Sequence, residues 1–207
     1  MSVHEGYTAW AATYDTDRNL TRDLDQTITQ QLLGATQYAA ILELGCGTGK
    51  NTAFLSQLGA HVHALDLTAA MIAQAQTKVT ASNVTWTVAD FTQPWPCADG
   101  SVDLVVANLV LEHLADLPFI FAEAFRCLMA GGRFFVSELH PFKQYVGAKA
   151  SFQRADSRIE IPAFVHHISE FLAAAAAAGL TLMRLDEWWH AEDEATPPRL
   201  VPFVFGK

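Results

Sequence analysis

The chain has 207 residues, of which 51% are hydrophobic and 17% are charged, and its formal net charge is −9. This length favours one domain with a sizeable core, and the composition excludes a disordered chain. The negative charge argues against nucleic acid or an anionic membrane surface as a partner, and no apolar run reaches the ~18 residues of a membrane span. The cysteines Cys46, Cys97 and Cys127 lack Cys-x-x-Cys spacing, which argues against a disulfide framework or structural zinc and favours a cytoplasmic protein.

Aromatic residues at helical spacing stand near the start of the chain. Tyr7, Trp10 and Tyr14 are three and four residues apart, so one helical face would hold all three. A second helix is predicted over 20–33, because its leucines and isoleucine recur at helical spacing. We expect this amphipathic helix to lie against the core.

From residue 39 onward, short apolar runs alternate with helical patterns. This alternation is typical of βαβ units and of a largely parallel, buried sheet with helices on both faces. Strands are expected at 39–44, 61–65, 84–88 and 102–107 and from residue 133 onward, and helices at 48–58, 69–78 and 117–128. The sequence therefore predicts an α/β fold with a Rossmann-like, mostly parallel sheet in a three-layer sandwich.

The pattern weakens after residues 140–141. Residues 142–160 are polar and irregular, 169–178 are helical, 180–189 resemble a strand, and 201–205 are expected to form a last antiparallel strand. Four basic residues fall in the irregular stretch: Lys143, Lys149, Arg154 and Arg158. The stretch is either a lid that attracts an anionic substrate or, more plainly, a solvated loop.

A glycine-rich segment, Glu43-Leu44-Gly45-Cys46-Gly47-Thr48-Gly49, leaves one predicted strand and opens a predicted helix. Open α/β sheets bind ligands at such junctions, because glycine lets the backbone turn close to the ligand while free N–H groups face outward. A dinucleotide fingerprint requires Gly-x-Gly-x-x-Gly, whereas Lys50 stands at its last position. The spacing argues against NAD, and a tight turn without a ligand is the alternative.

Two acidic residues stand at the ends of the next two strands. Asp66 follows the second strand, where a carboxylate can accept hydrogen bonds from both hydroxyls of an adenosine ribose. Asp90 follows the third strand beside Phe91, which offers an acceptor for an adenine amino group next to a ring that covers the base. Either acid alone is equally consistent with a helix cap or a turn.

These motifs together resemble those of a known family. The stretches 41–52 (ILELGCGTGKNT), 64–71 (ALDLTAAM), 88–91 (VADF), 102–113 (VDLVVANLVLEH) and 131–140 are similar to class I S-adenosylmethionine-dependent methyltransferases of the group that resembles ubiquinone and menaquinone C-methyltransferases. The resemblance implies a seven-stranded sheet with an antiparallel last strand, and methyl transfer from S-adenosylmethionine to a small molecule. We expect a single domain over 1–207, with cofactor-covering helices at 1–36, a cofactor-binding core at 37–140, a substrate lid at 141–165, and a helix and strands at 166–207.

The same resemblance assigns residues to the cofactor: the glycine loop to its methionine end, Asp66 to the ribose, and Asp90 with Phe91 to the adenine edge. The full set that it implies for cofactor binding is Tyr14, Glu43, Gly45, Cys46, Gly47, Asn51, Asp66, Leu67, Met71, Asp90, Phe91, Asn108 and Leu109. Tyr7 and Trp10 would close over the cofactor and line an acceptor pocket together with His113 and His140.

The chemistry at such a site is in-line displacement at a methyl group on a positive sulfur, which requires alignment and exclusion of water but no metal. An acceptor amine, hydroxyl or acidic carbon also needs a base, and His113 and His140 are candidates because each follows a strand that ends near the cofactor. The alternative is that neither histidine acts as a base, since relatives with varied acceptors share a Leu-Glu-His run after the fourth strand. Other adenosyl chemistry, a non-catalytic cofactor-binding module, and a monomeric or homodimeric state all stay open.

Overall fold

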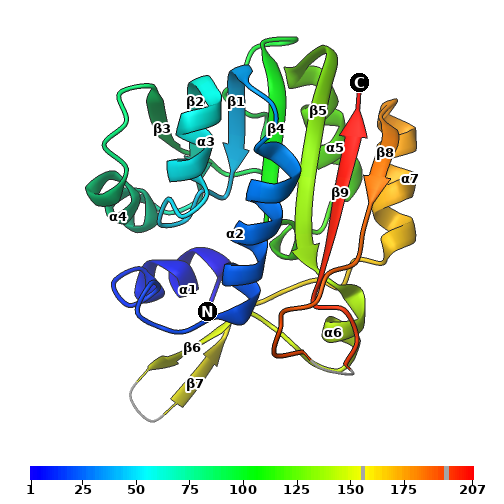
Figure 1. The fold of residues 1–207 in the computed structure, drawn as a ribbon. Coiled ribbons are helices and arrows are strands. Elements are labelled where there is room, and N and C mark those ends of the chain that lie inside the picture. The colour runs from blue at the N-terminus through cyan, green and yellow to red at the C-terminus, as the bar shows by residue number, and fades with distance from the viewer. Residues whose placement is uncertain (155–156, 194–195) are drawn as a thin grey trace.

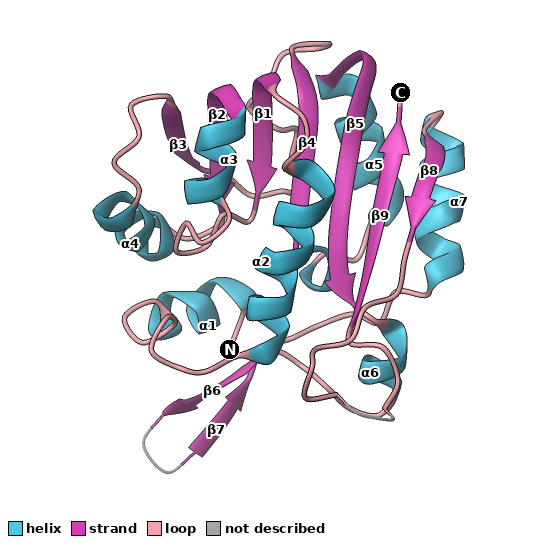
Figure 2. Cartoon of the chain, viewed as in Figure 1, coloured by secondary structure: helices cyan, strands magenta, loops and turns pink. Residues whose placement is uncertain are grey.

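A computed structural model describes residues 1–154, 157–193 and 196–207. Within these residues the central sheet has seven strands in the order β3-β2-β1-β4-β5-β9-β8 (Figures 1 and 2). Their bounds are β1 Tyr38–Leu44, β2 Gly59–Asp66, β3 Val84–Val88, β4 Val102–Asn108, β5 Leu128–Leu139, β8 Thr181–Leu185 and β9 Leu200–Gly206. β1 to β5 are parallel, and β9 is antiparallel to both β5 and β8. The predicted α/β fold and the antiparallel last strand are confirmed.

Helices cover both faces of the sheet and its carboxyl edge. The helices of the described ranges are α1 Val3–Trp10, α2 Leu20–Leu33, α3 Thr52–Leu58, α4 Ala69–Lys78, α5 Leu117–Cys127, α6 Pro141–Tyr145 and α7 Ile168–Ala178, with a 3-10 turn, η1, at Leu111–His113. Ile28 of α2 and Leu55 of α3 pack on Phe135 of one face. Phe121 of α5 and Phe171 of α7 pack on the opposite face. The apolar stripes of these helices therefore bury both faces of the sheet, as the near-continuous apolar strands require.

The sheet topology creates one opening at its carboxyl edge. The chain passes from β1 outward to β2 and β3, then crosses back to β4 on the other side of β1. The chain consequently leads from β1 and from β4 to helices on opposite faces of the sheet, which is the arrangement where open α/β sheets bind ligands. α1 and the start of α2 lie across this edge (Figure 1).

Several predicted elements begin or end elsewhere than expected, and β5 begins at Leu128 instead of residue 133. α3 begins at Thr52 instead of residue 48, because Gly45, Gly47 and Gly49 all have positive φ and cannot belong to a right-handed helix. α1 ends at Trp10, so the expectation that one helical face holds Tyr14 as well is wrong. The Tyr14 ring still meets Trp10, with centroids 4.6 Å apart, because the chain turns back after the helix.

The C-terminal third also departs from the prediction. The stretch predicted to be irregular contains α6 and a hairpin of β6 Ser151–Arg154 and β7 Ser157–Glu160. Phe152 of this hairpin is buried and stacks on Trp10 at 5.2 Å, so a contact distant in sequence stabilises the hairpin. β8 ends at Leu185 and not at residue 189, although Trp188 still pairs with Leu200 as an isolated bridge.

Candidate active site

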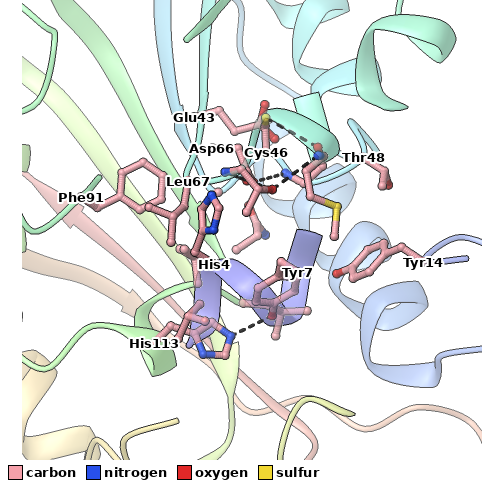
Figure 3. A pocket seen from close by; sticks show the side chains of 18 of the residues that line it. His4, Tyr7, Tyr14, Glu43, Cys46, Thr48, Asp66, Leu67, Phe91 and His113 are labelled. Atoms are coloured by element: carbon pink, nitrogen blue, oxygen red, sulfur yellow. Dashed lines mark hydrogen bonds between the residues drawn. The ribbon is translucent and has the colours of Figure 1, made fainter. Parts of the chain in front are cut away.

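A cavity of about 360 Å³ lies at the carboxyl edge of the sheet, between α1 and the loops that follow the strands (Figure 3). All thirteen residues expected to bind the cofactor line it, and so do Tyr7 and His113. The lining also includes residues that the sequence analysis missed: Ser2, Val3, His4, Arg22, Asp25, Thr48, Lys50, Thr68, Thr92, Val110 and Leu114. The fold therefore brings strand-end residues and the N-terminal segment to one place.

Two glycines of the loop after β1 have different reasons to be glycine. Gly45 has φ +68°, and a Cβ on it would lie 2.7 Å from Cγ2 of Val110, so its absence lets the loop after β4 pack against this turn. Gly47 has φ +52°, and a Cβ on it would meet no protein atom within 4 Å. Since Gly47 lines the cavity, this empty space is available to a ligand.

Asp66 holds the glycine loop from the end of β2. Its Oδ2 accepts a hydrogen bond from the backbone N–H of Gly47 at 2.9 Å. Its Oδ1 accepts bonds from the backbone N–H and the hydroxyl of Thr68 at 2.8 and 3.0 Å. Burial raises the pKa of this carboxyl, and these hydrogen bonds oppose the rise. A carboxylate has about four acceptor positions, so one position on Oδ2 stays free beside the cavity.

A polar cluster under the cavity contains unsatisfied acceptors. The Asp25 carboxylate of α2 accepts hydrogen bonds from Nδ2 of Asn51 at 2.9 Å and from Nδ2 of Asn108 at 2.8 Å. These bonds fix both amides so that their Oδ1 atoms are left buried without a hydrogen-bond partner in the described structure. Buried acceptors of this kind require donors, and all three residues line the cavity. A ligand group with several N–H donors fits this cluster.

Glu43, near the end of β1, is a buried acid beneath the glycine loop. Its Oε2 accepts a hydrogen bond from the Thr52 hydroxyl at 2.6 Å. Burial raises the pKa of Glu43 to about 8, with a further rise from the nearby charges of Asp66 and Asp25 and an opposing effect of the Thr52 bond. At neutral pH this side chain is therefore mostly protonated.

The loop after β4 is held in a strained conformation. Leu109 has φ +52°, and it is the non-glycine residue with positive φ within the described ranges. Its backbone N–H donates to the carbonyl of Ser137 at 2.8 Å. The next two N–H groups, of Val110 and Leu111, donate to Oε1 of Glu138 at 2.9 and 2.8 Å. These bonds keep an αL residue in place where the loop faces the cavity.

His113 and Tyr7 form a hydrogen-bonded pair at the α1 side of the cavity (Figure 3). His113 Nε2 is 2.8 Å from the Tyr7 hydroxyl, and His113 Nδ1 is 2.8 Å from the carbonyl oxygen of Pro162. Because a carbonyl only accepts, Nδ1 carries the proton and neutral His113 has its lone pair on Nε2. The Tyr7 hydroxyl thus donates to Nε2, and burial raises the pKa of Tyr7 well above its ordinary value.

Two residues predicted for the acceptor pocket are not among the described residues that line the cavity. Trp10 instead packs between Tyr14 and Phe152. His140 caps the start of α6, where its Nδ1 accepts from the Phe142 N–H, and its Nε2 is 3.0 Å from Oε1 of Glu187. The structure therefore separates His140 from His113, although both follow strands.

Within the described ranges, no helix combines the length and the apolar character that crossing a bilayer requires. The same residues contain no cluster of three or more His, Cys, Asp or Glu side chains that would hold a metal ion. The three cysteines are free thiols.

Comparison with known proteins identifies relatives of this chain. Residues 42–136 match the family model described as a methyltransferase domain. The chain is 31% identical over 167 residues to the biotin biosynthesis bifunctional protein BioHC of Cellvibrio japonicus, covering 81% of this chain and 33% of that protein. It is 27% identical over 165 residues to the demethylmenaquinone methyltransferase of Tropheryma whipplei, covering 79% of this chain and 65% of that enzyme. The match thus spans less than two thirds of either relative.

Among solved structures, the N-methyltransferase NodS of Bradyrhizobium japonicum, crystallised with S-adenosyl-L-homocysteine, has the same fold. Its TM-score is 0.73 at 16% identity, with 99% of this chain and 98% of that chain covered. At this identity the likeness concerns the fold.

Proposed function

Because the chain belongs to the class I S-adenosylmethionine-dependent methyltransferases, we propose that its cavity binds S-adenosylmethionine and that the protein transfers the methyl group to a small-molecule acceptor. The observation that carries this proposal is the joint placement, at one sheet edge, of an unobstructed glycine turn, Asp66 and two unsatisfied amide oxygens. The amide oxygens suit the amino-acid end of the cofactor and Asp66 suits its ribose, while the glycine turn leaves room for the chain that joins them.

The amino-acid end is assigned to the cluster around Asp25. An ammonium group has three N–H donors. Among the described residues the Oδ1 atoms of Asn51 and Asn108 lack partners. Burial raises the pKa of the Asp25 carboxyl beside them, and a bound ammonium group would favour its ionised form. This arrangement supports Asn51 and Asn108, expected from the sequence, and adds Asp25 to the binding set.

The ribose is assigned to Asp66 and the adenine to the side of the cavity formed by Leu67, Met71, Asp90 and Phe91. The free acceptor position of Asp66 Oδ2 supports one strong hydrogen bond to a ribose hydroxyl. The other hydrogen bonds of Asp66 connect the ribose site to the glycine loop, so this carboxylate both binds the ribose and positions the loop.

The bound cofactor supplies a methyl group on a positively charged sulfur. The chain's residues align the acceptor with that group and exclude water, and His113 accepts the acceptor's proton at Nε2. The Pro162 carbonyl positions this base by holding the proton on Nδ1. An acceptor hydroxyl, amine or acidic carbon that displaces the Tyr7 hydroxyl from Nε2 is the substrate type that this geometry favours.

Other parts of the proposal rest on fewer observations. A small-molecule acceptor is supported by the name of one relative, demethylmenaquinone methyltransferase, and by the enclosed position of the Tyr7–His113 pair. The free thiols support a cytoplasmic location. A single domain, the role of 141–165 as a substrate lid, and a monomeric or homodimeric state remain part of the same proposal.

Incubation with methyl-labelled S-adenosylmethionine and a panel of amines, phenols and quinols tests this function. We expect S-adenosylhomocysteine to accumulate together with one labelled acceptor, and Gly47→Val to abolish both. Cofactor binding without any product across the panel would favour a non-catalytic module or different adenosyl chemistry. A folded protein without measurable affinity for either form of the cofactor would contradict the proposal itself.

A further inference from the structure

Arg22, in the first turn of α2, brings a positive charge to the wall of the cavity. A guanidinium stays charged at any pH that a protein tolerates. Within the described ranges no carboxylate forms an ion pair with Arg22. Two acids near it pair instead with lysines: Asp15 with Lys78, and Asp23 with Lys50. The charge of Arg22 is therefore available to an anionic group in the cavity.

The turn between α1 and α2 holds the Arg22 guanidinium in one position. Nη1 and Nη2 donate hydrogen bonds to the backbone carbonyls of Tyr14 and Asp17, the second at 3.1 Å. The guanidinium carbon lies 4.0 Å from the centroid of the Tyr14 ring and 5.5 Å from that of the Trp10 ring. Because these contacts already fix the side chain, an anion that binds to it costs little further conformational entropy.

The third nitrogen of the guanidinium, Nε, is an unsatisfied donor. It is buried and has no hydrogen-bond partner among the described residues. A buried donor on a charged group requires an acceptor, and a carboxylate oxygen satisfies both the donor and the charge. Asp25, which belongs to the cluster assigned to the ammonium group, is three positions further along α2. Cβ atoms at such positions lie about 5–6 Å apart on one face of a helix.

We propose that Arg22 binds the carboxylate of the cofactor's amino-acid end through Nε, beside the Asp25 cluster that binds its ammonium group. This inference rests on the proposed function and assigns the one charged group of the cofactor that the Asp25 cluster leaves without a partner. The carboxylate and the ammonium group of an amino acid are attached to the same carbon, so their partners must be neighbours, as Arg22 and Asp25 are. Since the guanidinium also holds the Tyr14 and Asp17 carbonyls, a bound carboxylate stabilises the turn between α1 and α2.

Titration calorimetry with two probes tests this contact. The probes are S-adenosylhomocysteine and its decarboxylated form, which keeps the ammonium group and lacks the carboxylate. The wild-type protein should bind S-adenosylhomocysteine more tightly than the decarboxylated form. In Arg22→Ala this preference, the ratio of the two dissociation constants, should fall by about 10- to 150-fold, as expected for the loss of a hydrogen bond between charged groups. The ratio cancels any effect of the substitution on both probes alike.

Arg18→Ala is the matched control, because Arg18 is exposed, pairs with Glu192 and is not among the described residues that line the cavity. Its preference should equal that of the wild type. Arg22→Gln keeps an amide donor for the carbonyls of the turn and should also lose the preference, so the test does not depend on the stability of the alanine variant. An unchanged preference in either folded Arg22 variant, or an equal loss in Arg18→Ala, would overturn the contact while leaving the proposed function intact. Wild-type protein that binds neither probe would overturn the proposed function and this inference with it.

Discussion

Gly47→Ala should weaken cofactor binding far more than its matched control, Gly100→Ala. Gly47 has φ +52° and Gly100 has φ +57°, and a Cβ on either residue meets no heavy atom within 4 Å. An alanine in this left-handed region costs roughly 1–2 kcal/mol. For a chain of this size each kcal/mol lowers the melting temperature by about 2–4 °C, so both variants should melt lower by the same few degrees.

The two variants should differ in affinity because only Gly47 lines the cavity. A methyl group in a space that a ligand fills forces displacement of the kind seen on overpacking, at a cost of about 1–3 kcal/mol. This corresponds to a dissociation constant about 5- to 150-fold higher, and Gly47→Val should exceed it. Gly100→Ala should bind as the wild type does.

Titration calorimetry with S-adenosylhomocysteine, together with thermal unfolding of the same samples, measures both quantities. If Gly47→Ala binds with wild-type affinity, the cofactor does not approach this turn. If Gly100→Ala loses affinity to the same extent, the loss comes from destabilisation of the protein and not from contact of the new methyl group with the cofactor. The inference that the space beside Gly47 holds the cofactor would then fail.

Three further outcomes follow from the site. Asp66→Ala should weaken cofactor binding by about 1–3 kcal/mol, because it removes a hydrogen bond to the ribose. The control Asp116→Ala removes the exposed cap of α5, so it should cost about 1 kcal/mol of stability and leave the affinity measured by calorimetry unchanged. Equal affinities of the two variants would contradict the ribose assignment. His113→Gln should lower turnover by about 100- to 10,000-fold at unchanged cofactor affinity, because it removes the base. Tyr7→Phe should lower turnover less, because the lone pair on Nε2 of His113 remains. Initial rates measure both effects, and full activity of His113→Gln would exclude His113 as the base. The folded protein keeps a proton on Glu43 up to about pH 8, whereas the unfolded chain releases this proton near pH 4.5. The free energy of unfolding should therefore fall as the pH rises from about 4.5 to about 8. For this single group the fall is at most ~1.4 kcal/mol per pH unit. Glu43→Gln should reduce that slope in urea titrations, and an unchanged slope would mean that Glu43 is ionised when folded.

The core of the fold was predictable because its signals are local. Apolar runs bounded by turns mark β1 to β4, and the glycine spacing marks the turn after β1. The β6–β7 hairpin was not predictable, since Phe152 is its buried anchor and the partner ring, Trp10, stands far away in the sequence. Whether such short, polar strands form depends on tertiary contacts more than on their own sequence.

The residues of the candidate site also differ in whether local sequence signals could predict them. Residues at strand ends were expected, and the cavity contains them. Asp25 was missed because an acid within an amphipathic helix is read as part of the solvated face, and only packing shows it buried between two asparagines. His113 and His140 could not be distinguished from the sequence, because each follows a predicted strand. β4 lies next to β1, whereas β5 is one strand farther from the opening, which separates the two histidines.

The position of α1 has a consequence for exchange kinetics. This eight-residue helix contributes one wall of the cavity and is attached through side-chain contacts such as Tyr7 to His113 and Trp10 to Phe152. A molecule enclosed behind α1 leaves when these contacts open, so its residence time and the local unfolding of the helix are linked. Amide hydrogens of α1 should accordingly exchange more slowly when the cavity is filled, and the speed of product release should follow the strength of those side-chain contacts.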